Sequence, residues 1–203
     1  AGGLGNLAEA RIERAGGGGP GTVYRLTTPD GAARTFTVRS YPIGTGTNLI
    51  QRTRPYLDSW RDPNGNTYAF HYYTNGALPE YGQLRRIEAA NGNFIGLYYD
   101  VAGHITEAYA GDGRRVKYRY DDYGDLVEVT LPDGAVHAYA YGHRTGSNGI
   151  YSTHLLVRED KPEGNVLENT YDSLRRVTEQ RATVGEDGAL VRNGTFVDRK
   201  SVV

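Results

Sequence analysis

Cysteine and methionine are absent from the 203-residue sequence, and it holds only 4 phenylalanines and 1 tryptophan. Without cysteine there is no disulfide framework and no thiolate metal site. There is no run of about 18 apolar residues, so no segment is predicted to span a membrane. Neither sign of charge dominates, since 23 Lys and Arg stand against 24 Asp and Glu. Overall composition therefore gives no reason to expect nucleic acid or an anionic membrane as a partner, because either would require clustered basic residues.

Glycine and tyrosine are abundant, with 28 and 17 residues. Glycines that are spread along a chain indicate many tight turns. Tyrosine suits strands with one partly dry face, because the ring packs while the hydroxyl stays in contact with water.

A period of 21 residues organises the middle of the chain. It separates Gly92, Gly113 and Gly134 from one another, and it also separates the pairs Tyr99-Asp100 and Tyr120-Asp121. A fixed period of this length is typical of repeat architectures. The residues that mark the predicted repeat are Tyr99, Asp100, Gly103, Tyr120, Asp121, Gly124, Tyr171, Asp172, Gly65, Gly92, Gly113, Gly134 and Gly164.

Alternation after each turn glycine predicts a half-buried β-strand. Positions three, five and seven residues on are mostly large and apolar or aromatic, whereas the positions between them are mixed. After Gly113 the first set is Val116, Tyr118 and Tyr120, and the second is Arg115, Lys117 and Arg119. A period of two with one apolar face fits a strand and not a helix. Asp-Gly and Asn-Gly between such runs predict hairpins.

A second strand is predicted in each unit, beginning at Leu84, Ile105, Leu126 and Val177. Alternation is less regular there, which suggests a β-bulge whose position the sequence does not define. Two connections interrupt the period, residues 41–60 and 142–152. Long loops are a usual place for function, but the favoured interpretation of both is a spacer between hairpins.

The two ends are predicted to differ from the repeats. Residues 1–21 hold eight glycines and are expected to form a flexible linker, with a short helix over 7–15 as the alternative. Repeats are expected over 22–197 and are clearest over 62–181. The last six residues, 198–203, follow no pattern and look like a translated sequencing adapter, so they are interpreted as an assembly artefact.

These motifs resemble those of the Rhs/YD-repeat family. The resemblance rests on the Tyr-Asp pairs and on the Gly-x-apolar or equivalent segments that follow them, at Gly103-His104-Ile105, Gly124-Asp125-Leu126 and Arg175-Arg176-Val177. The third segment departs from the pattern because it has Arg175 where glycine is usual. The resemblance covers roughly residues 62–181, with a weaker extension back to Thr22.

The resemblance implies an all-β fold in which antiparallel hairpins form a continuous curved sheet, as a strip of a hollow β-shell. In family members that shell encloses a C-terminal toxin, or it stands on a cell surface in adhesion. The family's cleavage signature of the DPxGL type is not found, because Asp62-Pro63 belongs to a repeat turn. Neither cleavage machinery nor a toxin is therefore expected in this chain.

The sequence offers no catalytic, cofactor or metal site. Its five histidines, His71, His104, His137, His143 and His154, show no metal-ligand spacing such as HExxH. His137 falls on the packed face, which favours a structural role. Aspartates before turn glycines and in the Tyr-Asp pairs recur once per unit, which indicates local hydrogen bonding and not catalysis.

Three functions are compared. A structural segment of a secreted or surface repeat protein is favoured, with neighbouring repeats and an enclosed or displayed effector as partners. A carbohydrate- or protein-binding module that uses tyrosine-rich strands and a glycan or cell-surface ligand is the alternative. An enzyme has no supporting residue. Unpaired strand edges also predict that the isolated chain is marginally stable or self-associates.

Overall fold

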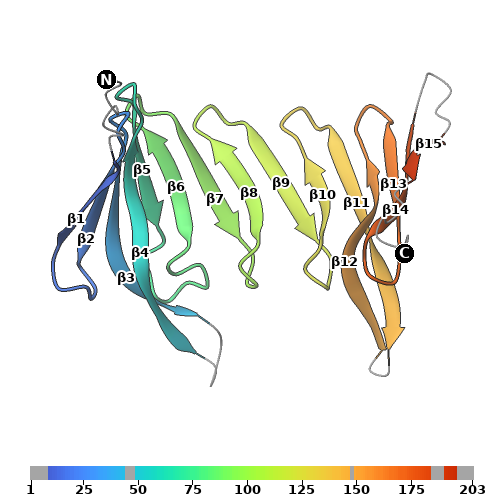
Figure 1. Ribbon diagram of the computed structural model, residues 1–203, viewed down its shortest axis with the longest axis horizontal. Helices are drawn as coiled ribbons and strands as arrows, with labels where there is room; N and C mark the ends of the chain where they lie inside the picture. The colour runs from blue at the N-terminus through green and yellow to red at the C-terminus, as the bar shows by residue number, and fades with distance from the viewer. Residues whose placement is uncertain (1–8, 44–48, 147–148, 184–189, 196–203) are drawn as a thin grey trace, which may run out of the picture. The chain divides into compact units, whose positions relative to one another are not determined.

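The computed structural model describes residues 9–43, 49–146, 149–183 and 190–195. Over these residues the chain forms antiparallel β-strands and no helix (Figure 1), so the predicted all-β class is confirmed. The chain divides into two compact units, residues 1–114 and 115–203. Within each unit every strand pairs with its neighbours in chain order.

The described residues of unit 1 form eight strands. They are β1 (Arg11–Ala15), β2 (Val23–Thr27), β3 (Ala33–Ile43), β4 (Ile50–Arg61), β5 (Thr67–Tyr72), β6 (Leu84–Ala89), β7 (Phe94–Tyr99) and β8 (Ile105–Ala110). In unit 2 the part of the chain that the structure describes forms seven strands. They are β9 (Arg115–Tyr120), β10 (Leu126–Thr130), β11 (Val136–Gly146), β12 (Gly149–Asp160), β13 (Val166–Tyr171), β14 (Val177–Thr183) and β15 (Leu190–Thr195). The predicted second strands therefore begin where expected, at Leu84, Ile105, Leu126 and Val177.

Alternation along the strands has the predicted consequence for burial. In β9 the side chains of Val116, Tyr118 and Tyr120 are half-buried, whereas the charged side chains between them are exposed. Successive side chains of a strand point to opposite faces of the sheet. Because of this alternation, one face of the sheet is more apolar and the other is more polar.

A β-bulge recurs in the second strand of each repeat. The pairing register shifts opposite the last two residues of the preceding strand, at Arg85, Thr106, Val127 and Thr178. Three of these bulges are 21 residues apart. The irregular alternation of the second strands therefore has a regular cause, because each bulge inserts one residue and reverses the facing of the rest.

Two long hairpins replace the predicted spacer loops. Residues around 41–60 belong to β3–β4, which pair from Ala33 and Arg61 out to Ile43 and Ile50. Residues around 142–152 belong to β11–β12, which pair out to Gly146 and Gly149. Both hairpins reach past the turns of the shorter hairpins beside them (Figure 1). The spacer interpretation is wrong there, because polar and glycine-containing segments still satisfy their backbone groups by cross-strand pairing.

The linker expected over residues 1–21 is also partly wrong. β1 pairs with β2 along its whole length, from Arg11 opposite Thr27 to Ala15 opposite Val23. Glycines between them form the connecting turn, with Gly16, Gly18 and Gly21 at positive φ. Residues 1–8 and the presumed artefact at 198–203 lie outside the described residues.

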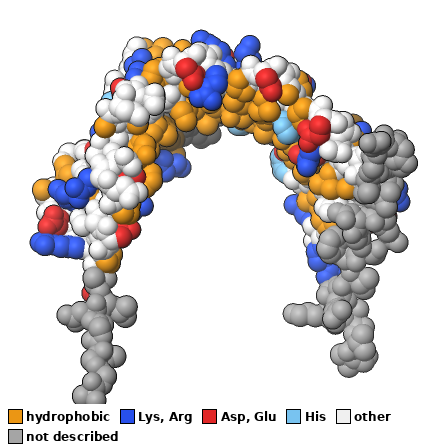
Figure 2. All heavy atoms as spheres, turned by 90° about the horizontal axis from the view of Figure 1, so that it is seen from above, with side chains coloured by type: hydrophobic (Ala, Val, Ile, Leu, Met, Phe, Trp, Pro, Cys, Tyr) orange, Lys and Arg blue, Asp and Glu red, His pale blue; other side chains and the backbone are white. Residues whose placement is uncertain are grey.

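Burial is shallow throughout the described residues. The apolar side chains with less than a tenth of their surface exposed are Ala32, Ala33, Val38, Tyr41 and Tyr56, all in unit 1. Figure 2 shows hydrophobic side chains in orange at the surface. A sheet of one layer cannot enclose large side chains, so each hairpin gains most of its stability from the hairpins beside it.

Candidate functional site

The Asp of each Tyr-Asp pair organises the turn that follows it. In three turns its Oδ1 accepts hydrogen bonds from the backbone N–H groups two and four residues later. The acceptors are Asp100, Asp121 and Asp172, with donor distances of 2.8 to 3.0 Å. Asp62 makes the same pair of bonds, at 2.9 and 2.8 Å. Hydrogen bonds from Arg176 lower the pKa of Asp172 below its ordinary value.

The backbone conformation of these turns requires glycine at the fourth position. Its N–H donates to the carbonyl of the first turn residue, as Gly124 does to Asp121 at 3.0 Å. This type I turn with a bulge needs a left-handed residue there. The glycines of the predicted signature have φ between +83° and +92°, which only glycine adopts without strain. They are Gly65, Gly92, Gly103, Gly113, Gly124, Gly134 and Gly164.

Arg175 occupies the same position in the 172–176 turn. Its φ is +63°, and its N–H donates to the Asp172 carbonyl at 3.0 Å. The turn therefore keeps the repeat geometry despite the departure in sequence, and a non-glycine residue bears the strain.

Substitution of Arg175 by glycine is expected to stabilise the chain by about 0.5–1 kcal/mol, because relief of left-handed strain exceeds the added freedom of the unfolded chain. The difference in free energy of unfolding is measured by urea unfolding of Arg175→Gly and of the parent chain. The reverse change, Gly124→Arg, is the matched control and is expected to destabilise. A loss of stability in Arg175→Gly would contradict this account of the turn.

Three tyrosines at the ends of strands have a second structural role. The hydroxyl of each donates to the backbone carbonyl of a leucine 15 residues earlier. Tyr72 bonds to Leu57 at 2.9 Å, Tyr99 to Leu84 at 2.7 Å and Tyr171 to Leu156 at 2.8 Å. We call this contact the tyrosine–carbonyl bond. Because the acceptor lies at or beside a bulge, the bond satisfies a carbonyl where regular cross-strand pairing is interrupted.

Loss of the Tyr99 hydroxyl is expected to cost about 1 kcal/mol of unfolding free energy, because the Leu84 carbonyl loses its donor. Tyr99→Phe is compared with Tyr68→Phe, whose hydroxyl makes no hydrogen bond to the described residues. Equal stability of the two variants would contradict the role of the bond.

Alkaline pH tests the same bond without mutation. Burial raises the pKa of Tyr99 to about 12, above its ordinary value of 10. Ionisation is therefore less favourable in the folded chain, so the stabilisation is complete below pH 10 and is lost as the pH rises from 10 toward 12. Tyr99→Phe is expected to show a smaller loss of stability over this range than the parent.

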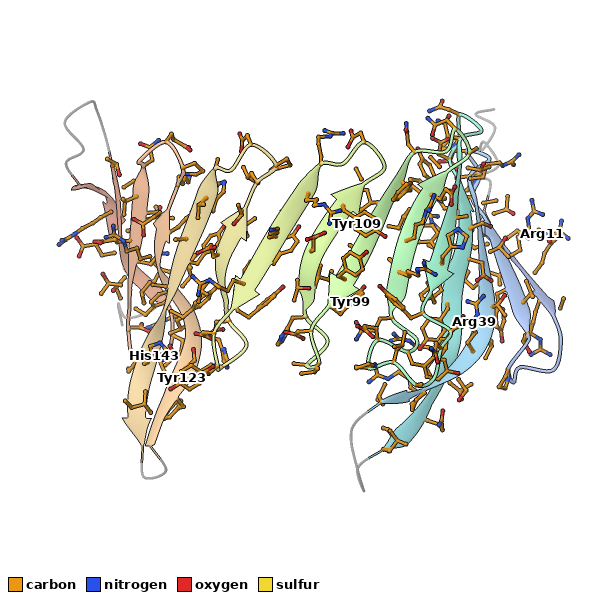
Figure 3. All side chains as sticks on the ribbon, turned by 180° about the vertical axis from the view of Figure 1, so that it is seen from behind. Arg11, Arg39, Tyr99, Tyr109, Tyr123 and His143 are labelled. Atoms are coloured by element: carbon orange, nitrogen blue, oxygen red, sulfur yellow. The ribbon has the colours of Figure 1, made fainter. Side chains whose placement is uncertain are left out.

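A cluster of polar side chains in unit 2 departs from the repeat pattern. We call it the Asp125 cluster; it consists of Tyr123, Asp125, His143, Ser152 and His154. Asp125 is only 7% exposed. The Ser152 hydroxyl donates to its Oδ2, and its Oδ1 lies 2.7 Å from Nδ1 of His154. Figure 3 shows Tyr123 and His143 beside each other near the base of the second long hairpin, with ring centroids 5.1 Å apart.

The Asp125 side chain is directed to β12 because, in its own turn, its carboxylate would be repelled by that of Asp121. At the equivalent positions His104 pairs with Asp100 at 3.0 Å, and Arg176 pairs with Asp172 at 2.8 Å. A carboxylate there would meet the carboxylate of Asp121. The change from a basic to an acidic residue is the sequence signal for this cluster, and the sequence analysis did not use it.

Several contacts fasten the hairpin β11–β12 to the 121–125 turn. The Tyr123 hydroxyl donates to the Ile150 carbonyl at 3.3 Å, and the N–H of His154 donates to Ser152 Oγ at 3.0 Å. His154 has a left-handed φ of +57°, which directs its ring to Asp125. Burial alone would raise the pKa of Asp125, but hydrogen bonds from Ser152 and His154, with the charges of His154 and His143, lower it overall.

The cluster does not have the geometry of an acyl-transfer triad. In such a triad the histidine lies between serine and aspartate and takes the serine proton. Here the Ser152 hydroxyl donates to the carboxylate itself. The three side chains are therefore arranged to hold the hairpin.

Unit 1 has an open groove of about 500 Å³ lined mainly by small residues of β4, β5 and β6. Its titratable side chains are His71 and Glu88, which lie 3.6 Å apart and are 51% and 35% exposed. Such open, exposed groups do not form a shielded reaction site. No group of three or more metal-ligating side chains occurs among residues 9–43, 49–146 and 149–183. No helix among the described residues is long and apolar enough to cross a bilayer.

The repeat was compared with models of known protein families. Residues 99–136 match the RHS Repeat family. The resemblance to Rhs/YD-repeat proteins is therefore confirmed over this stretch. A search of curated proteins finds no match.

Two solved structures are similar to the chain. One is a Photorhabdus luminescens Tc holotoxin pore with a mutated TccC3, at 12% identity and a TM-score of 0.39, covering 85% of this chain and 10% of that one. The other is the crystal structure of TcdB2-TccC3-TEV, at 11% identity and a TM-score of 0.35, covering 92% of this chain and 12% of that one. The chain therefore spans about a tenth of the length of either protein.

Proposed function

We propose that this chain is a structural segment of a large secreted or cell-surface Rhs/YD-repeat protein, forming part of a β-shell that encloses or displays a C-terminal effector. The observation that carries the proposal is the use of the repeated residues. In the pairs Tyr99-Asp100 and Tyr171-Asp172 the tyrosine bonds to the preceding strand and the aspartate bonds to the next turn. Because these side chains form hydrogen bonds with backbone groups, they are not free to act in catalysis. We therefore propose no enzymatic role.

Imaging of the full-length protein tests this proposal. Cryo-electron microscopy of the product of the complete gene is expected to show the repeats as part of a wall around, or beneath, another polypeptide. A hairpin ribbon that forms no wall, with no further domain attached, would contradict it. Limited proteolysis gives a second readout, because an enclosed effector should resist cleavage until the wall is opened.

Carbohydrate binding is the second candidate, and one aromatic group favours it. The Tyr98 ring is 47% exposed and stacks on Tyr109, with ring centroids 5.0 Å apart. Tyr109 in turn lies over Gly96, whose missing Cβ would come within 2.3 Å of its ring (Figure 3 labels Tyr109). Flat exposed aromatic rings can stack on sugars.

A glycan array with the parent and Tyr98→Ala tests it. Glycan binding by the parent that disappears in Tyr98→Ala supports a sugar site. Absence of binding by the parent at high protein concentration contradicts the carbohydrate-binding candidate.

A further inference from the structure

Three Asn-Gly pairs lie in connections between strands of unit 1 that the structure describes. They are Asn64-Gly65, Asn75-Gly76 and Asn91-Gly92, and all of these residues are exposed. In an Asn-Gly pair the asparagine amide is easily lost, because glycine has no side chain to hinder attack of its backbone nitrogen on the asparagine Cγ. Exposure does not distinguish the three pairs, so the hydrogen bonds of the glycine nitrogen decide which pair is free to react.

In the two short turns the glycine nitrogen is held by the repeat geometry. Gly65 N–H donates to the Asp62 carbonyl at 3.1 Å, and Gly92 N–H donates to the Ala89 carbonyl at 2.9 Å. The nitrogen has to lose its proton before it can attack, and a proton that is held in a hydrogen bond to a carbonyl is harder to remove. The turn therefore protects both of these pairs.

Asn75-Gly76 lies in the longer connection of residues 73–83 and lacks this protection. Gly76 N–H donates to no group among the residues that the structure describes, although Leu78 N–H closes the turn around it by donating to the Asn75 carbonyl at 3.1 Å. The free nitrogen belongs to the residue directly after the asparagine, which is the position from which attack on Cγ closes a small ring.

The side-chain amide of Asn75 is also held in place for this attack. Ala77 N–H donates to Asn75 Oδ1 at 3.0 Å, which fixes the side chain against its own backbone and draws electron density from Cγ. Asn91 accepts the same bond from Asn93 N–H, also at 3.0 Å. The two asparagines are therefore a matched pair that differ in whether the following glycine nitrogen is bonded.

We propose that Asn75-Gly76 is a site of spontaneous covalent modification. The deprotonated Gly76 nitrogen forms a bond to Cγ of Asn75, the bond from Cγ to Nδ2 breaks, and the amide leaves with that proton as ammonia. Water then adds to one of the two carbonyls of the resulting cyclic imide, and the bond from that carbonyl to the Gly76 nitrogen breaks. The product is aspartate, or isoaspartate in which the main chain runs through the former side chain. The sum is the gain of water and the loss of ammonia.

Isoaspartate at this position would disturb the packing of Tyr41, because it lengthens the main chain by a methylene group. Tyr81 packs edge-on against Tyr41 with ring centroids 5.0 Å apart, and its ring also lies beside Gly76. Tyr81 N–H donates to the Leu78 carbonyl at 3.1 Å, directly after the turn that Asn75 begins. A longer main chain there would shift Tyr81 away from Tyr41.

Peptide mapping of the intact 203-residue chain during incubation at mildly alkaline pH tests the proposal. Mass spectrometry with fragmentation assigns each conversion of an amide to a carboxyl group, and protein isoaspartyl methyltransferase detects isoaspartate. Conversion at Asn75 is expected to be about fivefold faster than at Asn91, because no backbone hydrogen bond of ordinary strength has to be broken first. In guanidinium chloride the three pairs are expected to convert at similar rates, because unfolding removes the turns.

Gly76→Ala is the matched variant. Gly76 does not have a left-handed φ, and an added Cβ would make an ordinary contact of 3.7 Å with the Tyr81 ring, so the variant is compatible with the fold. Its methyl group hinders the attack, and conversion at Asn75 is expected to fall at least to the rate at Asn91. After long incubation the parent is expected to unfold at a lower denaturant concentration than fresh protein, whereas Gly76→Ala is expected to keep its initial stability.

Three results would overturn the proposal. The first is conversion at Asn75 that is no faster than at Asn91 in the folded chain. The second is a preference for Asn75 that persists in guanidinium chloride, which would assign it to the local sequence and not to the fold. The third is conversion at Asn75 that Gly76→Ala leaves unchanged. An incubated parent that carries isoaspartate and unfolds like fresh protein would contradict the effect on Tyr41.

Discussion

Gly82→Ala is expected to destabilise the chain by about 3 kcal/mol, the largest effect of any single methyl group considered. Two causes combine at this position. Gly82 has a φ of +86°, where an L-residue costs about 1–2 kcal/mol. An added Cβ would also lie 2.4 Å from Cγ of Tyr41, and overpacking of this kind costs about 1–3 kcal/mol.

Tyr41 cannot easily move away from the new methyl group. It is 6% exposed and packs edge-on against Tyr56 and Tyr81, each with ring centroids 5.0 Å away. This is the best-packed aromatic group in the described part of unit 1, and it joins the first long hairpin to the 73–83 connection. A shift of Tyr41 would therefore disturb both.

Gly92→Ala is the control, because it has the same φ of +86° and nothing within 4 Å of the added Cβ. It should lose only about 1 kcal/mol, from backbone strain. Denaturant unfolding of both variants measures the difference, which isolates the clash with Tyr41. If Gly82→Ala and Gly92→Ala lose the same unfolding free energy, Tyr41 moves aside without an energetic penalty. That result would contradict the packing argument.

Asp125→Ala is expected to cost about 2 kcal/mol, the second largest effect. The variant leaves the Ser152 hydroxyl, in a residue that is 7% exposed, without its acceptor, and it also removes the partner of His154. The exposed side of His154 limits the loss, since water can replace one partner. Asp122→Ala, an exposed neighbour, is the control and should change stability by less than about 0.5 kcal/mol.

Acid should reproduce this loss in the parent chain. Because the pKa of Asp125 is lowered in the folded state, its stabilisation is present above the unfolded value near 4 and is lost as the pH falls through the folded value. Asp125→Ala should therefore show a shallower acid dependence of unfolding free energy than the parent. Parallel curves would show that Asp125 is not a source of acid sensitivity.

Regular parts of the fold could be predicted because each has a local cause. Alternation defined the strands, and turn glycines such as Gly92 defined the hairpins, since positive φ excludes most other residues. The four second strands begin at their predicted residues. The turn at Arg175 was in doubt, and the structure gives it the same conformation as the glycine turns.

The long hairpins were not predicted, because their polar, glycine-containing segments suggested loops. Backbone pairing such as that of Ile43 with Ile50 depends little on side-chain pattern. The Asp125 cluster joins residues 27 and 29 positions apart, outside the period of the repeat.

The tyrosine–carbonyl bond has a consequence for how such a chain can change in length. In all three of these bonds the donor and acceptor are 15 residues apart, so both partners of each bond belong to the same pair of neighbouring strands. Duplication or removal of a complete 21-residue unit would leave the remaining bonds intact, whereas deletion of a few residues would break one. Proteins of this kind are thus free to grow or shrink in whole modules over evolution, and the gene should tolerate in-frame changes of that size best.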